Sequence, residues 1–165
     1  MSYILEMIKK GKLCNLSLGL SVAEIETIIK KPNNVLELSE ESQLWAYDYG
    51  LELYLENDVL NKITLKYDYM NKSFKLPKFF DASACLEFNK LCSIDTLIKI
   101  LDENDVDWEI NKNLCDDTNI CLSCNEVSQI FYCLDTHHIL SIQSVPVPFW
   151  VEQNAYWAKK NNRIG

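Results

Sequence analysis

The fold is decided by the stretch Trp45-Ala46-Tyr47-Asp48-Tyr49-Gly50-Leu51-Glu52-Leu53-Tyr54-Leu55. Large apolar side chains occupy alternate positions along it, and small or acidic residues take most of the positions between them. This period of two is typical of a β-strand with one buried face. The run is long for a single strand, so two interpretations stay open: one long strand, or a hairpin that turns at Asp48-Tyr49-Gly50.

A helix and further strands are predicted on either side of this stretch. Ser21-Val22-Ala23-Glu24 has the pattern of a capping box, which starts a helix, and Pro32 ends it. A short strand is expected at 35–38. After a turn at 56–58, Ile63 and Leu65 alternate with polar residues in a last strand. An additional short helix is predicted for 3–9.

The same order recurs in the second half of the chain. Ser93 opens a predicted helix 72 residues after Ser21, and alternation predicts strands near 106–110, 120–124, 127–134 and 139–145. The sequence therefore predicts an α+β protein of two tandem helix-plus-antiparallel-sheet units, with the helices on one face of the sheet.

This reading divides the chain into four parts. Residues 1–67 form the first unit, and 93–148 form the second. Residues 68–85 are basic and aromatic without a period, and we expect 68–92 to form a connector packed on the fold. Residues 149–165 form a C-terminal tail, for which a final helix is one interpretation.

Composition and charge narrow the possible functions. The chain has 165 residues, 48% of them apolar, which is enough for a substantial core. Its net charge of −8 disfavours nucleic acid and anionic membranes and favours basic partners. No secretory leader is evident, and no apolar run approaches the roughly 18 residues that span a bilayer. We expect a cytoplasmic protein with reduced thiols that binds neither nucleic acid nor membrane.

Acidic residues are concentrated in one part of the second half. They are Asp102, Glu103, Asp105, Asp107, Glu109, Asp116 and Asp117. Three interpretations are open: a solvated surface, an interface for a cationic partner, or paired acids for hydrolysis. We take the interface as the prediction for partner binding.

Cys121-Leu122-Ser123-Cys124 has the spacing of a CxxC motif, which occurs in metal sites and redox sites. Such a pair can supply half of a zinc site, or a redox pair where it opens a helix. Here the pair lies in a β pattern, where residues three apart face opposite sides, and no helix follows. The prediction is packed thiols, with no metal and no cofactor.

Histidine chemistry is confined to His137 and His138, which fall in an expected turn. They are the only imidazoles that could act as a general base. Hydrolase, phosphate-loop and dinucleotide motifs are absent from the sequence. We therefore predict no catalytic residues and no enzyme activity.

Three segments together carry a resemblance. They are 11–25, with Leu18-Gly19-Leu20-Ser21 opening the helix; Lys31-Pro32-Asn33; and the stretch from Trp45 to the strand at Leu60-Asn61-Lys62-Ile63-Thr64-Leu65. This layout resembles small bacterial immunity proteins encoded beside polymorphic or contact-dependent toxins, although Lys31 stands where that layout often has glycine. The doubled plan is also similar in outline to the β-lactamase inhibitory protein.

The resemblance implies a cytoplasmic, non-catalytic protein that binds and neutralises a cognate toxin domain, which is expected to be basic. A housekeeping adaptor on the same scaffold is the alternative. A small hydrolase comes third, and it requires His137, His138 and an acid such as Asp116 to converge.

Overall fold

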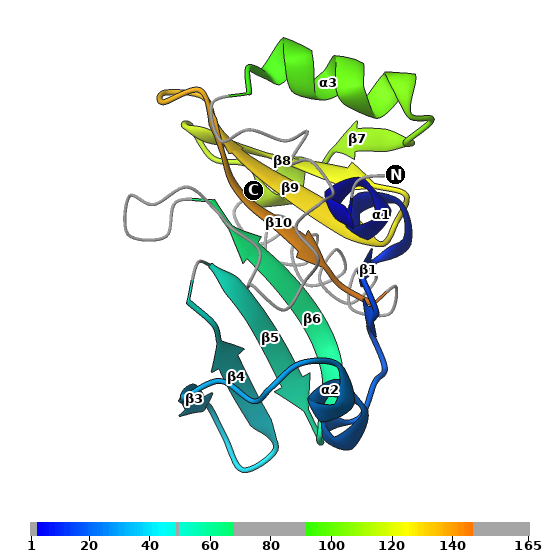
Figure 1. The fold of residues 1–165 in the computed structure, drawn as a ribbon. Helices are drawn as coiled ribbons and strands as arrows, with labels where there is room; N and C mark the ends of the chain where they lie inside the picture. Colours follow the sequence, from blue (N-terminus) through cyan, green and yellow to red (C-terminus); the bar gives the residue numbers. More distant parts are fainter. Residues whose placement is uncertain (1–2, 49, 68–91, 147–165) are drawn as a thin grey trace.

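The computed structural model describes residues 3–48, 50–67 and 92–146 (Figure 1). Within them the chain is α+β, as predicted, with helices beside a large antiparallel sheet. The helices are α1 (Tyr3–Lys10), α2 (Val22–Ile28), α3 (Ile94–Glu103) and the 3-10 turn η2 (Lys112–Leu114). The strands are β1 (Lys12–Leu13), β2 (Leu16–Ser17), β3 (Asn34–Glu37), β4 (Ser42–Ala46), β5 (Leu51–Glu56), β6 (Val59–Lys66), β7 (Trp108–Ile110), β8 (Asn119–Cys124), β9 (Ser128–Cys133) and β10 (His138–Ser144). No helix of this part is long and apolar enough to cross a membrane.

One continuous sheet contains the strands of both halves. Its order is β3-β4-β5-β6-β10-β9-β8-β7, and every neighbouring pair is antiparallel. The halves meet where β10 pairs with β6, with Ile142 opposite Leu65 (Figure 1). Residues from both halves therefore belong to one apolar core.

The stretch from Trp45 to Leu55 is a hairpin rather than one long strand. Gly50 has φ +91°, and the Tyr47 N–H donates to the Leu51 carbonyl at 2.9 Å. Trp45 lies opposite Leu53 and both are fully buried. The alternation continues through the turn because the returning strand places the same parity of residues on the same face.

The predicted helix starts are confirmed by their caps. The Glu24 N–H donates to Ser21 Oγ at 3.4 Å, and the Ser21 N–H donates to the Glu24 carboxylate at 2.9 Å, which completes the capping box. Likewise, the Thr96 N–H donates to Ser93 Oγ at 3.2 Å and caps α3.

The N-terminal helix packs on strands from the other half of the chain. Ser128 Oγ of β9 donates to the Ile8 carbonyl at 2.8 Å, and Ser144 Oγ of β10 donates to the Gly11 carbonyl at 3.0 Å. These two serines satisfy carbonyls at the end of α1 that have no partner inside the helix. The short β1–β2 hairpin that follows α1 turns at Cys14, where φ is +54°.

Two predicted segments fall outside the described residues. Of the connector 68–92 only Cys92 is described, and it is buried. The tail 149–165 and the last two residues of the second predicted unit are also outside the described part.

Candidate functional site

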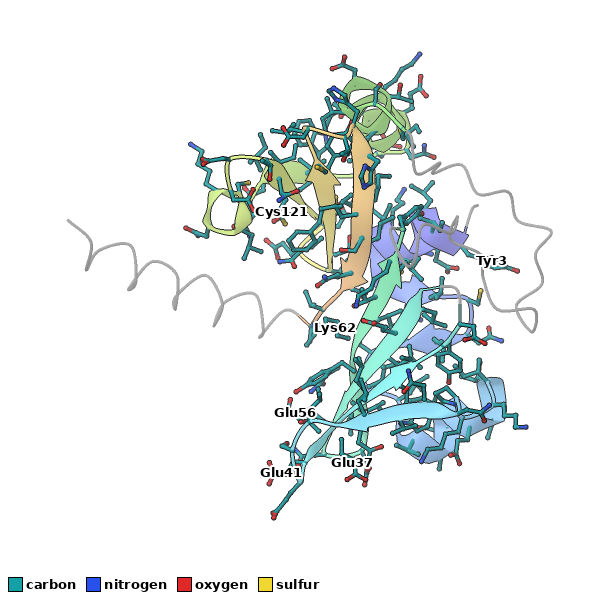
Figure 2. The ribbon with its side chains drawn as sticks, turned by 90° about the vertical axis from the view of Figure 1, so that its left-hand side faces the viewer. Tyr3, Glu37, Glu41, Glu56, Lys62 and Cys121 are labelled. Carbon is teal, nitrogen blue, oxygen red and sulfur yellow. The ribbon has the colours of Figure 1, made fainter. Side chains whose placement is uncertain are left out.

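One face of the sheet carries the apolar core, and the other is polar across its central strands but apolar at Leu36, Leu44 and Tyr54; the strand register assigns each residue to a face. The apolar face carries buried side chains such as Trp45, Leu53, Ile63 and Ile142. Tyr3 of α1 lies on one side of the sheet in Figure 2, whereas Lys62 and Cys121 lie on the other. On the polar face, one cross-strand row passes through all eight strands: Asn34, Ala46, Glu52, Thr64, Gln143, Gln129, Ser123 and Glu109.

The middle of this polar row is not accessible to a partner. Thr64, Gln129 and Ser123 are only 4%, 2% and 7% exposed. The two ends of the row, Asn34 on β3 and Glu109 on β7, are exposed. A protein partner that approaches this row therefore meets it at the two edges of the sheet.

The β7 edge holds five of the seven predicted partner-binding acids. We call them the β7 acids: Asp102, Glu103, Asp105, Asp107 and Glu109, all exposed. Trp108 Nε1 donates to the Asp102 carboxylate at 2.8 Å, which ties the end of α3 to β7. The structure thus brings a helix end, a turn and an edge strand together in one acidic surface.

Hydrogen bonds hold this surface in place. The Asp107 N–H donates to Asn125 Oδ1, and the Asn125 N–H donates to the Asp107 carbonyl, both at 2.8 Å. The start of β7 is thereby fixed to the β8–β9 turn. A surface that is rigid before binding loses less conformational entropy when a partner docks.

Among the described residues, few cations neutralise the β7 acids. Lys99 pairs with Glu103 at 3.7 Å, but both are well exposed, so solvent screens this pair. Lys9 of α1 instead donates to the Asn104 carbonyl at 2.7 Å. Across the described residues, no ion pair involves Asp105, Asp107 or Glu109. Their negative charge is available to a cationic partner.

Asp116 and Asp117 lie away from the β7 acids. They precede the start of β8, whereas Asp107 contacts Asn125 just beyond its other end. Six residues of strand separate these ends by about 17–20 Å. The predicted acidic segment is therefore two groups, one at each end of β8.

The Asp116 carboxylate has a structural role in its turn. It accepts from the side-chain amide of Asn119 and from the backbone N–H groups of Thr118 and Asn119, at 2.8–3.0 Å. These bonds stabilise the charged form and lower the pKa of Asp116 to about 2, with the Asn119 side chain as the largest cause.

A pH-dependent effect on stability follows for Asp116→Asn. A lowered carboxyl pKa stabilises the fold above the unfolded-state pKa, and this contribution disappears as pH falls through the folded value. We expect the variant to be less stable than the parent at pH 7, with the difference shrinking between about pH 4 and pH 2. Urea unfolding at several pH values measures this. Asp117→Asn is the control, because Asp117 is exposed and makes none of these bonds; equal pH profiles for the two variants would contradict the assignment.

A second acidic group lies at the opposite edge of the sheet, and the sequence did not single it out. We call it the β3–β4 acids: Glu37, Glu40, Glu41, Glu56 and Asp58, all exposed. The Asn57 N–H donates to the Glu41 carbonyl at 2.7 Å and joins the β5–β6 turn to the β3–β4 turn. Figure 2 shows Glu37, Glu41 and Glu56 at the same end of the molecule. Glu37, Glu40 and Glu41 were visible as a local acidic run, but only strand pairing adds the other two.

Cys121 and Cys124 face opposite sides of the sheet, as predicted. Cys121 lies opposite Phe131 on the polar face, and Cys124 lies opposite Ser128 on the apolar face. Both are fully buried, and burial raises the pKa of each thiol to about 12. One metal ion cannot bind both sulfurs directly in this arrangement.

Thiol reactivity should follow these environments. Cys133 sits at the end of β9, and hydrogen bonds from Thr136 lower its pKa. Because the thiolate is the reactive form, iodoacetamide at neutral pH should modify Cys133 at least about tenfold faster than Cys121 or Cys124. Peptide mass spectrometry of the folded protein measures the rates. In Cys133→Ser the labelling of Cys121 and Cys124 should stay slow, and fast labelling of Cys121 in either protein would contradict the described burial.

The two histidines differ in environment. His137 is exposed in the β9–β10 turn with φ +53°, and His138 is buried at the start of β10. The Leu134 N–H donates to the Thr118 carbonyl at 2.7 Å, so this turn adjoins the one that contains Asp116. The Asp116 carboxylate already accepts hydrogen bonds from the backbone and side chain of Asn119 in its own turn. These bonds make it poorly suited to proton transfer.

Assignment of function depends on these surfaces. Two of the exposed acidic groups of the described residues, the β7 acids and the β3–β4 acids, lie at the opposite edges of one sheet. Comparison of the chain with protein-family models, with curated proteins and with solved structures gives no match.

Proposed function

We propose that the chain is a non-catalytic, cytoplasmic immunity protein that binds a cognate toxin domain and neutralises it. The observation that carries the proposal is the β7 acids, which form an exposed and hydrogen-bonded surface on a sheet edge. Asp105, Asp107 and Glu109 can meet lysine and arginine on a basic toxin. Binding there neutralises the toxin either by covering its active site or by holding an inactive form.

The scaffold of the proposal is a pair of tandem units, α2 with β3–β6 and α3 with β7–β10. Two observations support it: the repeated order of one helix and four strands, and a strand order that is mirrored about the β6–β10 pair. Helices on one face are supported by the burial of Ile25 of α2 and Leu97 of α3 in the same core cluster. In the part of the chain that the structure describes, β3 and β7 each pair with one strand, which leaves their outer edges available for recognition.

Co-expression with the toxin encoded by the neighbouring gene tests the proposal. We expect the two proteins to form a complex and the cells to survive. The double variant Asp107→Lys/Glu109→Lys should lower the association rate at least about tenfold at low salt, because surface charges steer encounter. This effect should shrink as ionic strength rises.

The matched control is Glu26→Lys/Asp135→Lys, which changes net charge by the same amount at exposed positions on α2 and the β9–β10 turn. We expect it to alter the rate by less than about threefold, because only the net charge of the chain changes. Absence of both complex and protection with the parent protein would refute the immunity function. A complex without protection would support the adaptor alternative instead.

A further inference from the structure

We propose that the outer edge of β3 docks an extended segment of the protein partner that carries alternating lysine or arginine residues. The segment adds to the sheet as a further strand beside β3. This inference rests on the proposed function and names a second contact for the same partner, on the edge opposite the β7 acids.

The backbone of β3 offers unpaired groups along this edge. The Leu38 N–H donates to the Ser42 carbonyl at 2.9 Å, which sets the phase of the antiparallel ladder. Hydrogen-bonded positions alternate, so Leu36 also points its backbone groups toward β4, whereas Val35 and Glu37 point theirs away. Within the described residues β3 pairs with β4 alone. An open edge of this kind is a template for strand addition.

The side chains on one face of this edge are apolar. Leu36 and Leu38 are 48% and 56% exposed; of the other large apolar residues of the described chain, only Ile110 at 50% and Leu134 at 38% are comparably exposed. Leu36 lies opposite Leu44, and Leu44 lies opposite Tyr54, so an apolar strip continues inward over β4 and β5. Apolar residues on one face of an added strand can pack on this strip.

The other side chains favour a cationic guest. Glu37 points to the opposite face from Leu36, and Glu40 and Glu41 are exposed in the turn that follows. Lys31, which precedes the strand, lies 5.3 Å from the centre of the Trp45 ring, so the cations of the guest are expected beside Glu37, Glu40 and Glu41 rather than at the start of β3. A guest with apolar residues on one face and cations on the other matches this alternation.

Charge also decides between a cationic partner and a second copy of this chain. Two β3 strands paired edge to edge would bring the β3–β4 acids of both copies together, and like charges on adjacent strands are destabilising. Natural edge strands usually block such pairing with lysine or proline, and β3 (Asn34-Val35-Leu36-Glu37) contains neither. Its edge therefore excludes a second copy by charge while it stays open to a basic segment.

Amide hydrogen exchange of the full chain tests the inference, with a synthetic octapeptide of alternating lysine and valine as the probe. We expect the peptide to slow exchange of the Val35 and Glu37 amides at least about tenfold. Leu36 and Leu38, whose amides already face β4, should change much less. A peptide of alternating glutamate and valine should have no effect, because it meets the β3–β4 acids with like charge.

Variants separate strand addition from general charge attraction. Val35→Pro removes an outward N–H without removing a bond to β4, and should abolish the protection. Leu36→Ser/Leu38→Ser should weaken peptide binding at least about fivefold, because each exposed leucine loses its apolar contact. Leu134→Ser is the matched control, because it removes an exposed leucine from the β9–β10 turn.

Three results would overturn the inference: peptide binding without protection at Val35 and Glu37, equal binding by the leucine double variant, or dimers that protect these amides without peptide. The peptide assay contains no toxin, so it is independent of the immunity function. If the toxin binds the parent and the Val35→Pro variant with equal affinity, the β3 site is refuted but the immunity function is not. If the peptide protects the Val35 and Glu37 amides but the protein gives no protection from the toxin, the immunity function is refuted and the β3 site is not.

Discussion

Replacement of Gly50 by alanine is expected to lower the free energy of unfolding by about 3 kcal/mol. Two costs add up to this value: the strain of a positive φ in a residue with a Cβ, and a steric clash of that Cβ. Gly50 has φ +91°, a conformation that residues with a Cβ rarely adopt. A Cβ at this position would lie 2.3 Å from the Lys66 carbonyl oxygen, which belongs to the backbone and cannot rotate away. The ladder bond from the Lys66 N–H to the Gly50 carbonyl, now 2.8 Å, must shift as well.

Gly19→Ala is the control that separates the two costs. Gly19 has φ +89°, nearly the same as Gly50, but nothing lies within 4 Å of the added Cβ. Only the conformational cost of about 1 kcal/mol should remain. Urea unfolding of the two variants gives the comparison. Equal losses in both would show that the contact with Lys66 has no effect on stability.

Replacement of Ile142 by alanine should lower the free energy of unfolding by about 2–5 kcal/mol. Ile142 is fully buried on β10, opposite Leu65 of β6 and Ile130 of β9. Truncation leaves a cavity where the strands of the two halves meet. Both halves should therefore lose stability together, because they share one sheet and one core.

Hydrogen exchange at single amides measures this coupling. In the variant, amides of Leu53 in β5 and Ile130 in β9 should become less protected by equal free energies. Gln143→Ala is the control, because Gln143 is the next residue on β10 and faces the polar side; it should change stability by less than about 1 kcal/mol. Loss of protection confined to β8–β10 would mean that the two halves unfold independently.

Local structure was readable from the sequence because short-range contacts decide it. Ser21 and Ser93 predicted helix starts, since each cap joins groups three residues apart. The alternation around Gly50 predicted buried strands, but alternation alone did not choose between a strand and a hairpin. A glycine at φ +91° made the hairpin possible.

The candidate site was only partly readable. The sequence placed all seven acids of 102–117 in one surface, whereas the chain reversal through η2 and β8 separates Asp116 and Asp117 from the other five. The β3–β4 acids were missed as a group, because Glu56 and Glu41 become neighbours only through the pairing of β4 with β5.

By itself, the sequence determined the class of the fold, the helix caps, the strand alternation and the surface charge, because each depends on near neighbours along the chain. The tertiary structure alone decided that β6 pairs with β10, that α1 packs on β9 and β10, and that β3 and β7 are left as the two edges. Backbone amides and carbonyls are the same in every strand, so alternation does not specify which strands pair. That choice is made when side chains from distant segments pack into one core.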